Sequence, residues 1–381
     1  IFTKINGTKY WVVIAKTNAY VRESGTTWLQ IKSNLTTDLP TTAATFQDFL
    51  IITNGTDPVL RFNGKTTTGT IEVQAGTPTI LRGTDTKWNT SSHENQMSVG
   101  GRVKIGSTWY TIQTVTSDVL MTMTASMPTT GAGASYEAYG LPSLAGSPPT
   151  AKYVASHKNF VFLFGNSTNP TRLYFSDLGN AISYPAENFI DVDTNDGQVG
   201  TGMCSYKDTL GLFKYDSSGT RKSVNVLYGS SFDNFSLKQV NTEYSALDQR
   251  SIIVAPNMVY FLDRNGIIET NFITFRRLDT NVISTTLDSI NQQYIQNSSG
   301  IFFDEYIMFS VPTSNSTYND KIIVYDLTTT GFGIFTGINA STFSTYSSSH
   351  TPELYFGDQS NNSSIYKFNS GTDDNNLPIN W

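Results

Sequence analysis

The sequence has little of two residue types on which many sites depend. It contains one cysteine, Cys204, and three histidines, His93, His157 and His350. A single cysteine excludes an intrachain disulfide framework and a cysteine-based zinc site. The histidines stand in unrelated segments without the spacing of metal ligands. We therefore expect Cys204 to be a buried structural thiol and the histidines to be structural or surface residues.

Charged residues are also few, at 15% of the chain against about 25% in typical soluble domains. The formal net charge is −6, and the densest basic feature is the pair Arg276-Arg277. Proteins that hold nucleic acid neutralise its phosphates with a basic excess or patch. The composition therefore argues against stable nucleic-acid binding.

Long hydrophobic runs and catalytic motifs are missing. The longest apolar stretches, such as 160–164, have about five residues, whereas a helix that spans a bilayer needs about 20. We expect no stable membrane insertion. The motifs G-x-S-x-G, H-E-x-x-H and the P-loop do not occur, so the sequence predicts neither an enzyme nor a cofactor.

Aromatic residues, in contrast, are abundant, with 23 Phe and 20 Tyr. Such side chains fit the pleated surface of a sheet, and the residues that usually cover helices are sparse. A short aromatic and aliphatic run recurs along the chain, with starts 39, 111, 50, 49, 47 and 48 residues apart. The runs lie at 10–14, 49–52, 160–164, 210–213, 259–262, 306–309 and 354–356.

A partner strand follows each run, and Asp263-Arg264-Asn265-Gly266 is the clearest hairpin signal between two strands. A period of 40 to 50 residues with three or four strands is typical of propeller blades. We predict an all-β chain with a β-propeller of about six to seven blades, the last completed by the N-terminal residues 2–5. The alternative is a pair of β-sandwiches or an irregular protein of several sheets.

The one anomalous interval predicts an insertion. Five short strands at 69–73, 79–81, 102–105, 109–112 and 119–122 suit a small β-barrel or sandwich. We therefore divide the chain into a discontinuous propeller, residues 1–68 and 141–381, and an inserted domain, residues 69–140.

One acidic loop offers oxygen ligands of the kind that Ca²⁺ prefers. It contains Asp191, Asp193, Asn195 and Asp196. However, Gly197 falls one place late for a calcium-binding helix-loop-helix, and the expected glutamate is missing. A calcium site and a solvated turn are the two interpretations of this loop; the departures from the pattern favour the turn, and we expect no other metal.

The segment 23–28 has part of the Asp-box turn of sialidase propellers, S-x-D-x-G-x-T-W. Gly25, Thr27 and Trp28 match this pattern, but Glu23 replaces the aspartate. The pattern occurs once, and no carboxylate pair of the kind that glycosidases need stands out. A hairpin between two strands is the simpler interpretation.

Residues from about 152 to 270 resemble tail proteins of short-tailed bacteriophages. The resemblance lies in Arg172-Leu173-Tyr174-Phe175-Ser176-Asp177, followed by Tyr184-Pro185-Ala186-Glu187-Asn188-Phe189, and in the strands 206–214 and 259–267. The C-terminal segment 365–374 is similar as well, and 375–379 matches more loosely. The motifs are structural, so the resemblance supplies no catalytic residue.

This resemblance implies a tail nozzle or hub subunit in the virion, made in the host bacterial cytoplasm. Such a protein forms a homohexameric ring below the portal and adaptor, and it lets phage DNA pass without sequence-specific binding. Its expected partners are other tail proteins, with tail fibres as a further candidate. The alternative is a carbohydrate- or receptor-binding propeller adhesin, in which Trp28, Trp88 and Trp109 would stack on sugars. A third hypothesis is a sialidase-like hydrolase.

Overall fold

The protein is almost entirely β-structure. The computed structural model describes residues 1–91, 93–278, 281, 283–347, 351–359, 364–368, 373–374 and 377–378. In these residues the only helical elements are α1 (Ser284–Asp288) and the 3-10 turns η1 (Phe232–Asn234), η2 (Gln249–Ser251) and η3 (Ile295–Asn297). None of them is long and apolar enough to cross a membrane. The predicted fold class is confirmed: a β-propeller with an inserted β-barrel module.

Backbone contacts divide the chain into two compact units. The first comprises Ile1–Asp196 and Gly229–Phe235, and the second Gly197–Tyr228 and Ser236–Trp381. The boundaries proposed from the sequence, at 68/69 and 140/141, follow a different criterion and stay a prediction.

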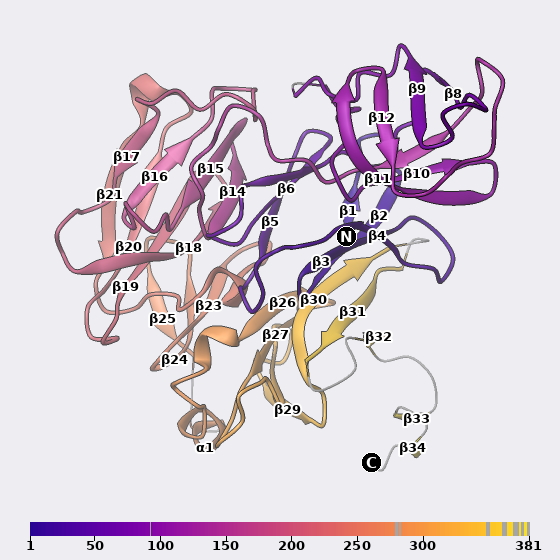
Figure 1. Ribbon diagram of the computed structural model, residues 1–381. Helices are drawn as coiled ribbons and strands as arrows, with labels where there is room; N and C mark the ends of the chain where they lie inside the picture. The colour runs from indigo at the N-terminus through magenta and orange to yellow at the C-terminus, as the bar shows by residue number, and fades with distance from the viewer. Residues whose placement is uncertain are drawn as a thin grey trace. The chain divides into compact units, whose positions relative to one another are not determined.

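The first unit contains three small antiparallel sheets (Figure 1). The first is β1 (Phe2–Thr3), β2 (Lys9–Ala15), β3 (Asn18–Arg22) and β4 (Leu29–Lys32); the second is β5 (Thr42–Phe46), β6 (Phe49–Thr53) and β7 (Leu60–Phe62); the third is β14 (Tyr153–His157), β15 (Phe160–Phe164), β16 (Arg172–Phe175) and β17 (Phe189–Asp191).

The N-terminal strand β1 belongs to the first sheet, where Phe2 pairs with Tyr10 and Thr3 with Lys9. The prediction that residues 2–5 complete the last sheet is therefore wrong. The reason is packing: Phe2 is fully buried and its ring lies 5.9 Å from that of Phe62, within the core shared by the first two sheets.

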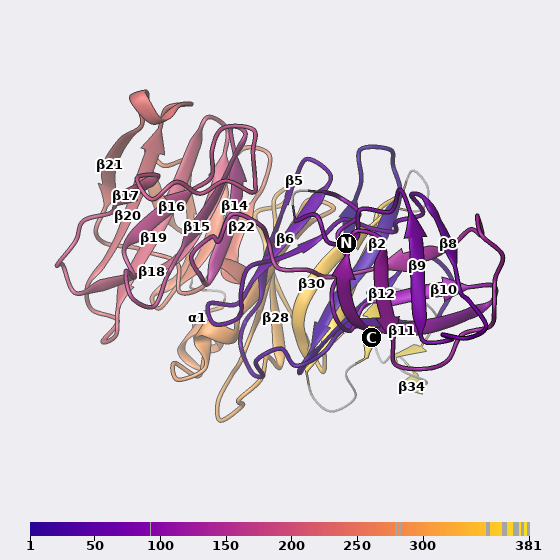
Figure 2. The same ribbon diagram turned by 45° about the horizontal axis from the view of Figure 1, so that its top comes forward.

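A six-stranded sheet forms the inserted module, in the order β13-β10-β11-β12-β9-β8. Its strands are β8 (Thr70–Glu72), β9 (Ile80–Thr84), β10 (Arg102–Ile105), β11 (Thr108–Ser117), β12 (Leu120–Met123) and β13 (Glu137–Tyr139). Ala134, just before β13 at one end of the order, bridges to Ile71 of β8 at the other end. The sheet thus closes on itself as a small barrel, and Figure 2 shows it curled.

The barrel is inserted where its two chain ends meet. The chain leaves after β7, and the returning segment runs antiparallel beside β7, since the Arg61 N–H donates to the Pro142 carbonyl and the Leu144 N–H to that of Val59. Gly69 begins the barrel with φ +81°, and a Cβ there would lie 2.3 Å from the Thr84 carbonyl oxygen. Only glycine fits this position without displacing the backbone.

The second unit contains three four-stranded sheets, one three-stranded sheet and a short hairpin (Figure 1). They are β18 (Gln198–Tyr206), β19 (Thr209–Asp216), β20 (Lys222–Tyr228) and β21 (Ser236–Asn241); β22 (Ile252–Val254), β23 (Val259–Asp263), β24 (Gly266–Thr270) and β25 (Phe275–Arg277); β26 (Ser299–Phe303), β27 (Tyr306–Val311), β28 (Lys321–Asp326) and β29 (Phe332–Thr336); β30 (Ala340–Tyr346), β31 (Glu353–Asp358) and β32 (Ile365–Lys367); and the hairpin β33 (Asp373–Asp374) and β34 (Leu377–Pro378).

Successive sheets of this unit touch through their first strands, because β22 lies beside both β18 and β26, and β26 lies beside β30. The first unit repeats this with β5 and β14. This contact between first strands is typical of propeller blades, whose faces are buried by radial stacking.

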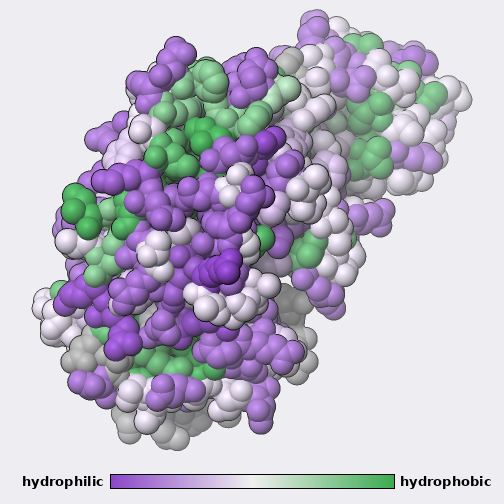
Figure 3. Space-filling model, turned by 90° about the vertical axis from the view of Figure 1, so that its left-hand side faces the viewer, coloured by the Kyte–Doolittle hydropathy of each residue, from purple (hydrophilic) through white to green (hydrophobic). Residues whose placement is uncertain are grey.

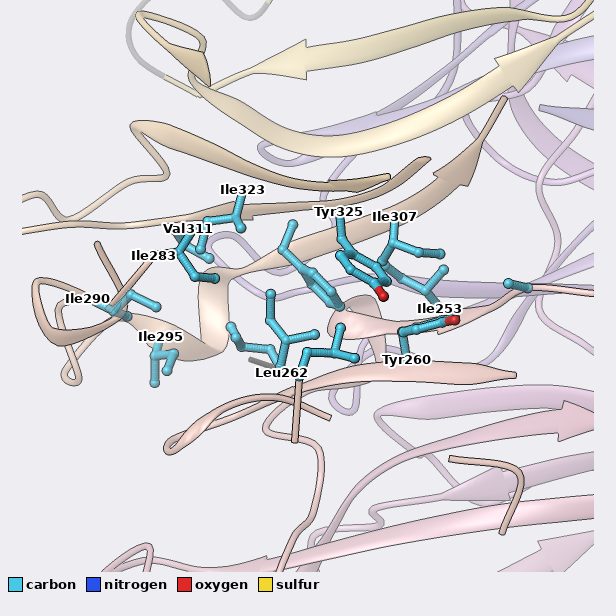
Figure 4. Close-up of a cluster of buried hydrophobic side chains, with 14 residues drawn as sticks. Ile253, Tyr260, Leu262, Ile283, Ile290, Ile295, Ile307, Val311, Ile323 and Tyr325 are labelled. Carbon is cyan, nitrogen blue, oxygen red and sulfur yellow. The ribbon is translucent and has the colours of Figure 1, made fainter. Parts of the chain in front are cut away.

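The core between two blades of the second unit is aliphatic with two tyrosines. Figure 4 shows Tyr260 and Leu262 of β23 facing Ile307 of β27 and Tyr325 of β28. The second strands β15, β19, β23 and β27 are buried along almost their whole length, because blades that stack radially cover the faces of these sheets.

Candidate functional site

The acidic loop proposed as a calcium site begins at Asp191, the last residue of β17, and this first carboxylate already has a partner. Arg172 donates from Nε and Nη2 to Asp191 at 2.7 and 2.9 Å, and its guanidinium lies 3.7 Å from the centroid of the Phe189 ring. Asp193 and Asn195 adopt left-handed φ angles of 44° and 67°, which suits a turn. Across the described residues, no three His, Cys, Asp or Glu side chains are grouped to hold a metal. Calcium binding by Asp191, Asp193, Asn195 and Asp196 stays a prediction without support.

The phage-like motif builds the outer part of one sheet. Phe175 is buried on β16, and the Asp177 carboxylate that follows accepts from the Ser183 hydroxyl at 2.5 Å and from Asn188 Nδ2 at 3.0 Å. The loop to β17 is therefore folded around Asp177, and the quoted residues have structural roles. The part of the resemblance at 369–372, 375–376 and 379 lies outside the described residues.

The remaining titratable candidates have structural surroundings. Cys204 is buried on β18, and burial raises the pKa of its thiol, so the reactive thiolate is disfavoured. His157 is buried on β14, and His93 accepts from the Asn95 N–H through Nδ1 at 3.1 Å. His350 lies outside the described residues.

The Asp-box-like segment, residues 23–28, connects β3 to β4 in the first sheet. The Arg22 guanidinium lies 4.6 Å from the ring centroid of Trp11 and 4.7 Å from that of Trp28. This cation–π sandwich occupies one face of Trp28. Trp88 is fully buried in the barrel, and Trp109 packs on Tyr139 with ring centroids 5.6 Å apart. The three tryptophans suggested as sugar platforms are thus engaged within the protein.

Glu23 of the same segment joins the first sheet to the barrel. Its Oε2 accepts from the Tyr139 hydroxyl at 2.8 Å and from Lys65 Nζ at 2.9 Å. Burial, together with the charge of Glu23, raises the pKa of Tyr139. The raised pKa favours the protonated phenol that donates this hydrogen bond, so Glu23 links the first sheet to the barrel through Tyr139 and to Lys65 through an ion pair. The Glu23–Tyr139 pair could not be predicted from the sequence, because 116 residues separate its members.

Buried tyrosines make the fold sensitive to alkali. Burial raises the pKa of Tyr139, Tyr184, Tyr215 and Tyr260 above the model-compound value of 10. A group whose folded pKa exceeds its unfolded pKa stabilises the fold fully below the unfolded pKa and loses that contribution as pH rises. We expect unfolding to set in above about pH 10. In a phenolate absorbance titration, exposed tyrosines should titrate first and these four only together with unfolding.

Tyr184 supplies the control for this titration, because its buried hydroxyl has no hydrogen-bond partner among the described residues. Tyr184→Phe should keep the fold and remove one late-titrating phenol. Titration of all 20 tyrosines in one step near pH 10, with the fold intact, would contradict the buried environments.

The outer strands of the sheets offer the clearest candidate interface. Most of these edges are charged or covered: β21 presents Lys238, β25 presents Arg276 and Arg277, and on β4 the Gln30 carbonyl accepts from Arg102 Nε of the barrel at 2.9 Å. Charged side chains and covering segments of this kind prevent a strand edge from pairing with another protein chain.

The edge strand β29 is different. Its sequence, Phe-Gly-Ile-Phe-Thr, has no charge, it pairs only with β28, and Ile334 and Phe335 are 40% and 44% exposed. The Phe335 ring contacts Phe368 edge-on at 5.7 Å. Other hydrophobic residues are exposed too, and Figure 3 shows one face on which they gather in patches between hydrophilic ones. Only β29 combines such residues with an uncharged outer edge among the described four-stranded sheets.

No protein-family profile and no curated protein matches the sequence. Similar solved structures are the phage phi92 endosialidase (11% identity, TM-score 0.34, 89% of this chain and 56% of that one), the GH43 endo-arabinanase from Bacillus licheniformis (11%, 0.26, 56% and 92%) and the AfRom2 CNH domain (9%, 0.27, 84% and 96%). The match thus spans little more than half of the endosialidase chain.

These comparisons correct the prediction that the protein is not an enzyme. Two of the three similar structures, the endosialidase and the endo-arabinanase, are glycoside hydrolases. At 9–11% identity the likeness concerns the fold, and no catalytic residue can be carried over from it.

Proposed function

We propose that the chain is a structural subunit of a bacteriophage tail, the tail nozzle, which assembles as a hexameric ring below the portal and adaptor rings. The observation that carries this proposal is the uncharged outer edge of β29, on which Ile334 and Phe335 are exposed. An uncharged edge strand is a ready template for association. In a ring the contact is heterologous, so the surface of one copy that includes β29 would meet a different surface of the next copy.

The composition of the chain supports the passage of DNA without retention. Only 25 residues are Lys or Arg against 31 Asp and Glu, and the net charge is −6. A chain of this composition has little basic surface to exchange counterions with phosphates. We further propose that the channel of the ring is net acidic, and a basic channel in the assembled ring would contradict this.

The alternative is a carbohydrate- or receptor-binding propeller, and a preparation of the isolated chain distinguishes the two. A nozzle subunit should form rings of defined mass and should bind the portal–adaptor complex. A stable monomer that binds or cleaves glycans would favour the alternative.

We expect Ile334→Lys to abolish ring assembly. The substitution places a charge on an edge that would be covered in the ring, and burial of an unpaired charge is strongly unfavourable. In a mass measurement, the wild type should give about six times 42.0 kDa and the variant a single copy.

The matched control for this experiment is Ile273→Lys. Ile273 is even more exposed, at 85%, but lies in the turn between β24 and β25 rather than on an edge strand. This variant should assemble like the wild type. Assembly of Ile334→Lys, or a monomeric wild type, would overturn the role of β29.

A further inference from the structure

The barrel carries a groove of about 400 Å³ on its surface. Strands β8 and β9 form one side, with Glu72, Arg82 and Thr84. Ser117, Val119 and Leu120, around the turn from β11 to β12, form the other. This volume lies near the lower end of the range for small-ligand sites. Nothing in the assembly role of β29 uses this groove.

Arg82 is the cation of this groove, and its side chain is exposed without an ion pair. In the antiparallel register Arg82 faces Glu72 on β8 and Leu120 on β12. Even so, no carboxylate of the described residues lies within the 4.0 Å of an ion pair from its guanidinium. The Glu72 carboxylate accepts instead from Gln74 Nε2 at 3.4 Å. A free guanidinium beside a concave surface is suited to a carboxylate, which it can bind through two parallel N–H groups.

The residues around Arg82 restrict further which ligands the groove can bind. Glu72 repels a polyanion, so a phosphate backbone is a poor fit, but its carboxylate can accept hydrogen bonds from hydroxyl groups. Thr84 and Ser117 add hydroxyls, while Val119, which is 45% exposed, and Leu120 add apolar surface. A ligand that satisfies all of these groups has one carboxylate, several hydroxyls and a C–H face.

We propose that this groove binds an acidic saccharide at a hexuronic acid unit. Arg82 pairs with the carboxylate of the sugar, Glu72, Thr84 and Ser117 bind its hydroxyls, and Val119 and Leu120 pack against its C–H face. The proposal gives the inserted barrel a binding role of its own, which is independent of whether the chain assembles through β29.

Titration of the full chain with sodium glucuronate, followed by saturation-transfer NMR and calorimetry, tests the proposal. We expect saturable binding of glucuronate, and binding at least about tenfold weaker for glucose or acetate, because each lacks part of the pattern. Arg82→Gln should weaken glucuronate binding by at least about tenfold, since a charge-assisted bond is lost. Arg277→Gln, which changes an exposed arginine of β25, should bind like the wild type.

A second variant blocks the groove without touching Arg82. Ala132 is exposed and lines the groove, so Ala132→Trp should abolish glucuronate binding while the melting temperature stays near that of the wild type. Three results would each overturn the proposal: no saturable binding of glucuronate, equal binding of acetate, or binding that survives Ala132→Trp. Preference for an acidic peptide over the sugar would do so as well.

Discussion

Replacing Asp263 by alanine is expected to lower the free energy of unfolding of the second unit by about 3–5 kcal/mol, because a buried ion pair is broken on one side. The Asp263 side chain is fully buried and that of Lys222 is 9% exposed, with Nζ and Oδ2 3.0 Å apart. The same carboxylate accepts from the Tyr215 hydroxyl and from the Ser245 N–H, each at 3.0 Å. Alanine would leave Lys222 charged and buried without a counter-ion.

The Lys222–Asp263 pair joins two neighbouring sheets, so we expect its loss to destabilise both. Lys222 is the first residue of β20 and Asp263 the last of β23, so the pair ties one blade to the next. Hydrogen exchange of peptides from β19 to β24, measured by mass spectrometry during denaturation, would locate the loss. This readout is preferable to fluorescence, because four of the five tryptophans lie within residues 1–109.

Two control variants separate the buried pair from charge in general. Arg276→Ala removes the partner of Glu269 in a pair whose arginine is 63% exposed, and should cost no more than about 1 kcal/mol. The double variant Asp263→Leu with Lys222→Met should recover part of the loss, because it removes the unpaired lysine charge but leaves the Tyr215 hydroxyl and the Ser245 N–H without their acceptor. A cost below about 1 kcal/mol for Asp263→Ala, comparable with that of a surface pair, would show that the pair is not buried as described.

The second large effect is expected for Trp88→Ala in the barrel, which should cost about 3–5 kcal/mol, as for other buried aromatic residues. Trp88 is fully buried, its Nε1 donates to the Tyr136 hydroxyl at 3.1 Å, and the two rings meet edge-on at 5.8 Å. The Tyr136 hydroxyl in turn donates to the Thr68 carbonyl oxygen at 2.6 Å, where the chain enters the barrel. Removal of Trp88 leaves both a cavity and an unpaired hydroxyl acceptor.

If the barrel folds as an independent domain, this loss should stay within it. We expect hydrogen exchange to increase in β8 to β13 and to stay unchanged in β14 to β17. Trp11→Ala, in the first sheet, is the comparison that should leave exchange in the barrel unchanged. Equal loss of protection in both regions would contradict a separately folding insertion at residues 69–140.

The second strand of each blade-like sheet could be predicted from sequence, whereas the first strands other than β1 could not. The recurring aromatic runs coincide with β2, β6, β15, β19, β23, β27 and β31, each of which pairs with a strand on both of its edges. The first strands are weaker signals: β5 reads Thr-Ala-Ala-Thr-Phe and β30 Ala-Ser-Thr-Phe-Ser-Thr-Tyr. Small and hydroxyl side chains allow neighbouring strands to pack closely. The same residues are typical of loops, so the sequence does not indicate a strand there.

The barrel was predicted with five strands and has six. The missed strand, β13 (Glu137–Tyr139), is only three residues long, and its role depends on Ala134 bridging to Ile71, far away in the sequence. The hairpin at 263–266 was read correctly, because Asp263 pairs directly with Gly266. Local turn chemistry is visible in a sequence, while barrel closure is not.

The candidate sites show the same limit of local sequence. The acidic cluster at Asp191 lies within one segment and predicts a site, but Asp191 pairs with Arg172 across two strands. The sequence shows an apolar run at 332–335, which forms β29. Only the strand order shows that the outer edge of this strand is unpaired. Likewise, the groove at Arg82 depends on segments that the barrel brings together.

Electron cryomicroscopy of the purified chain, alone and with the portal–adaptor complex, tests the central claim most directly. Our account predicts a closed ring of six copies in which β29 of each subunit, with Ile334 and Phe335, is covered by its neighbour. A monomeric chain that binds or cleaves glycans, or a ring in which β29 faces solvent, would contradict it.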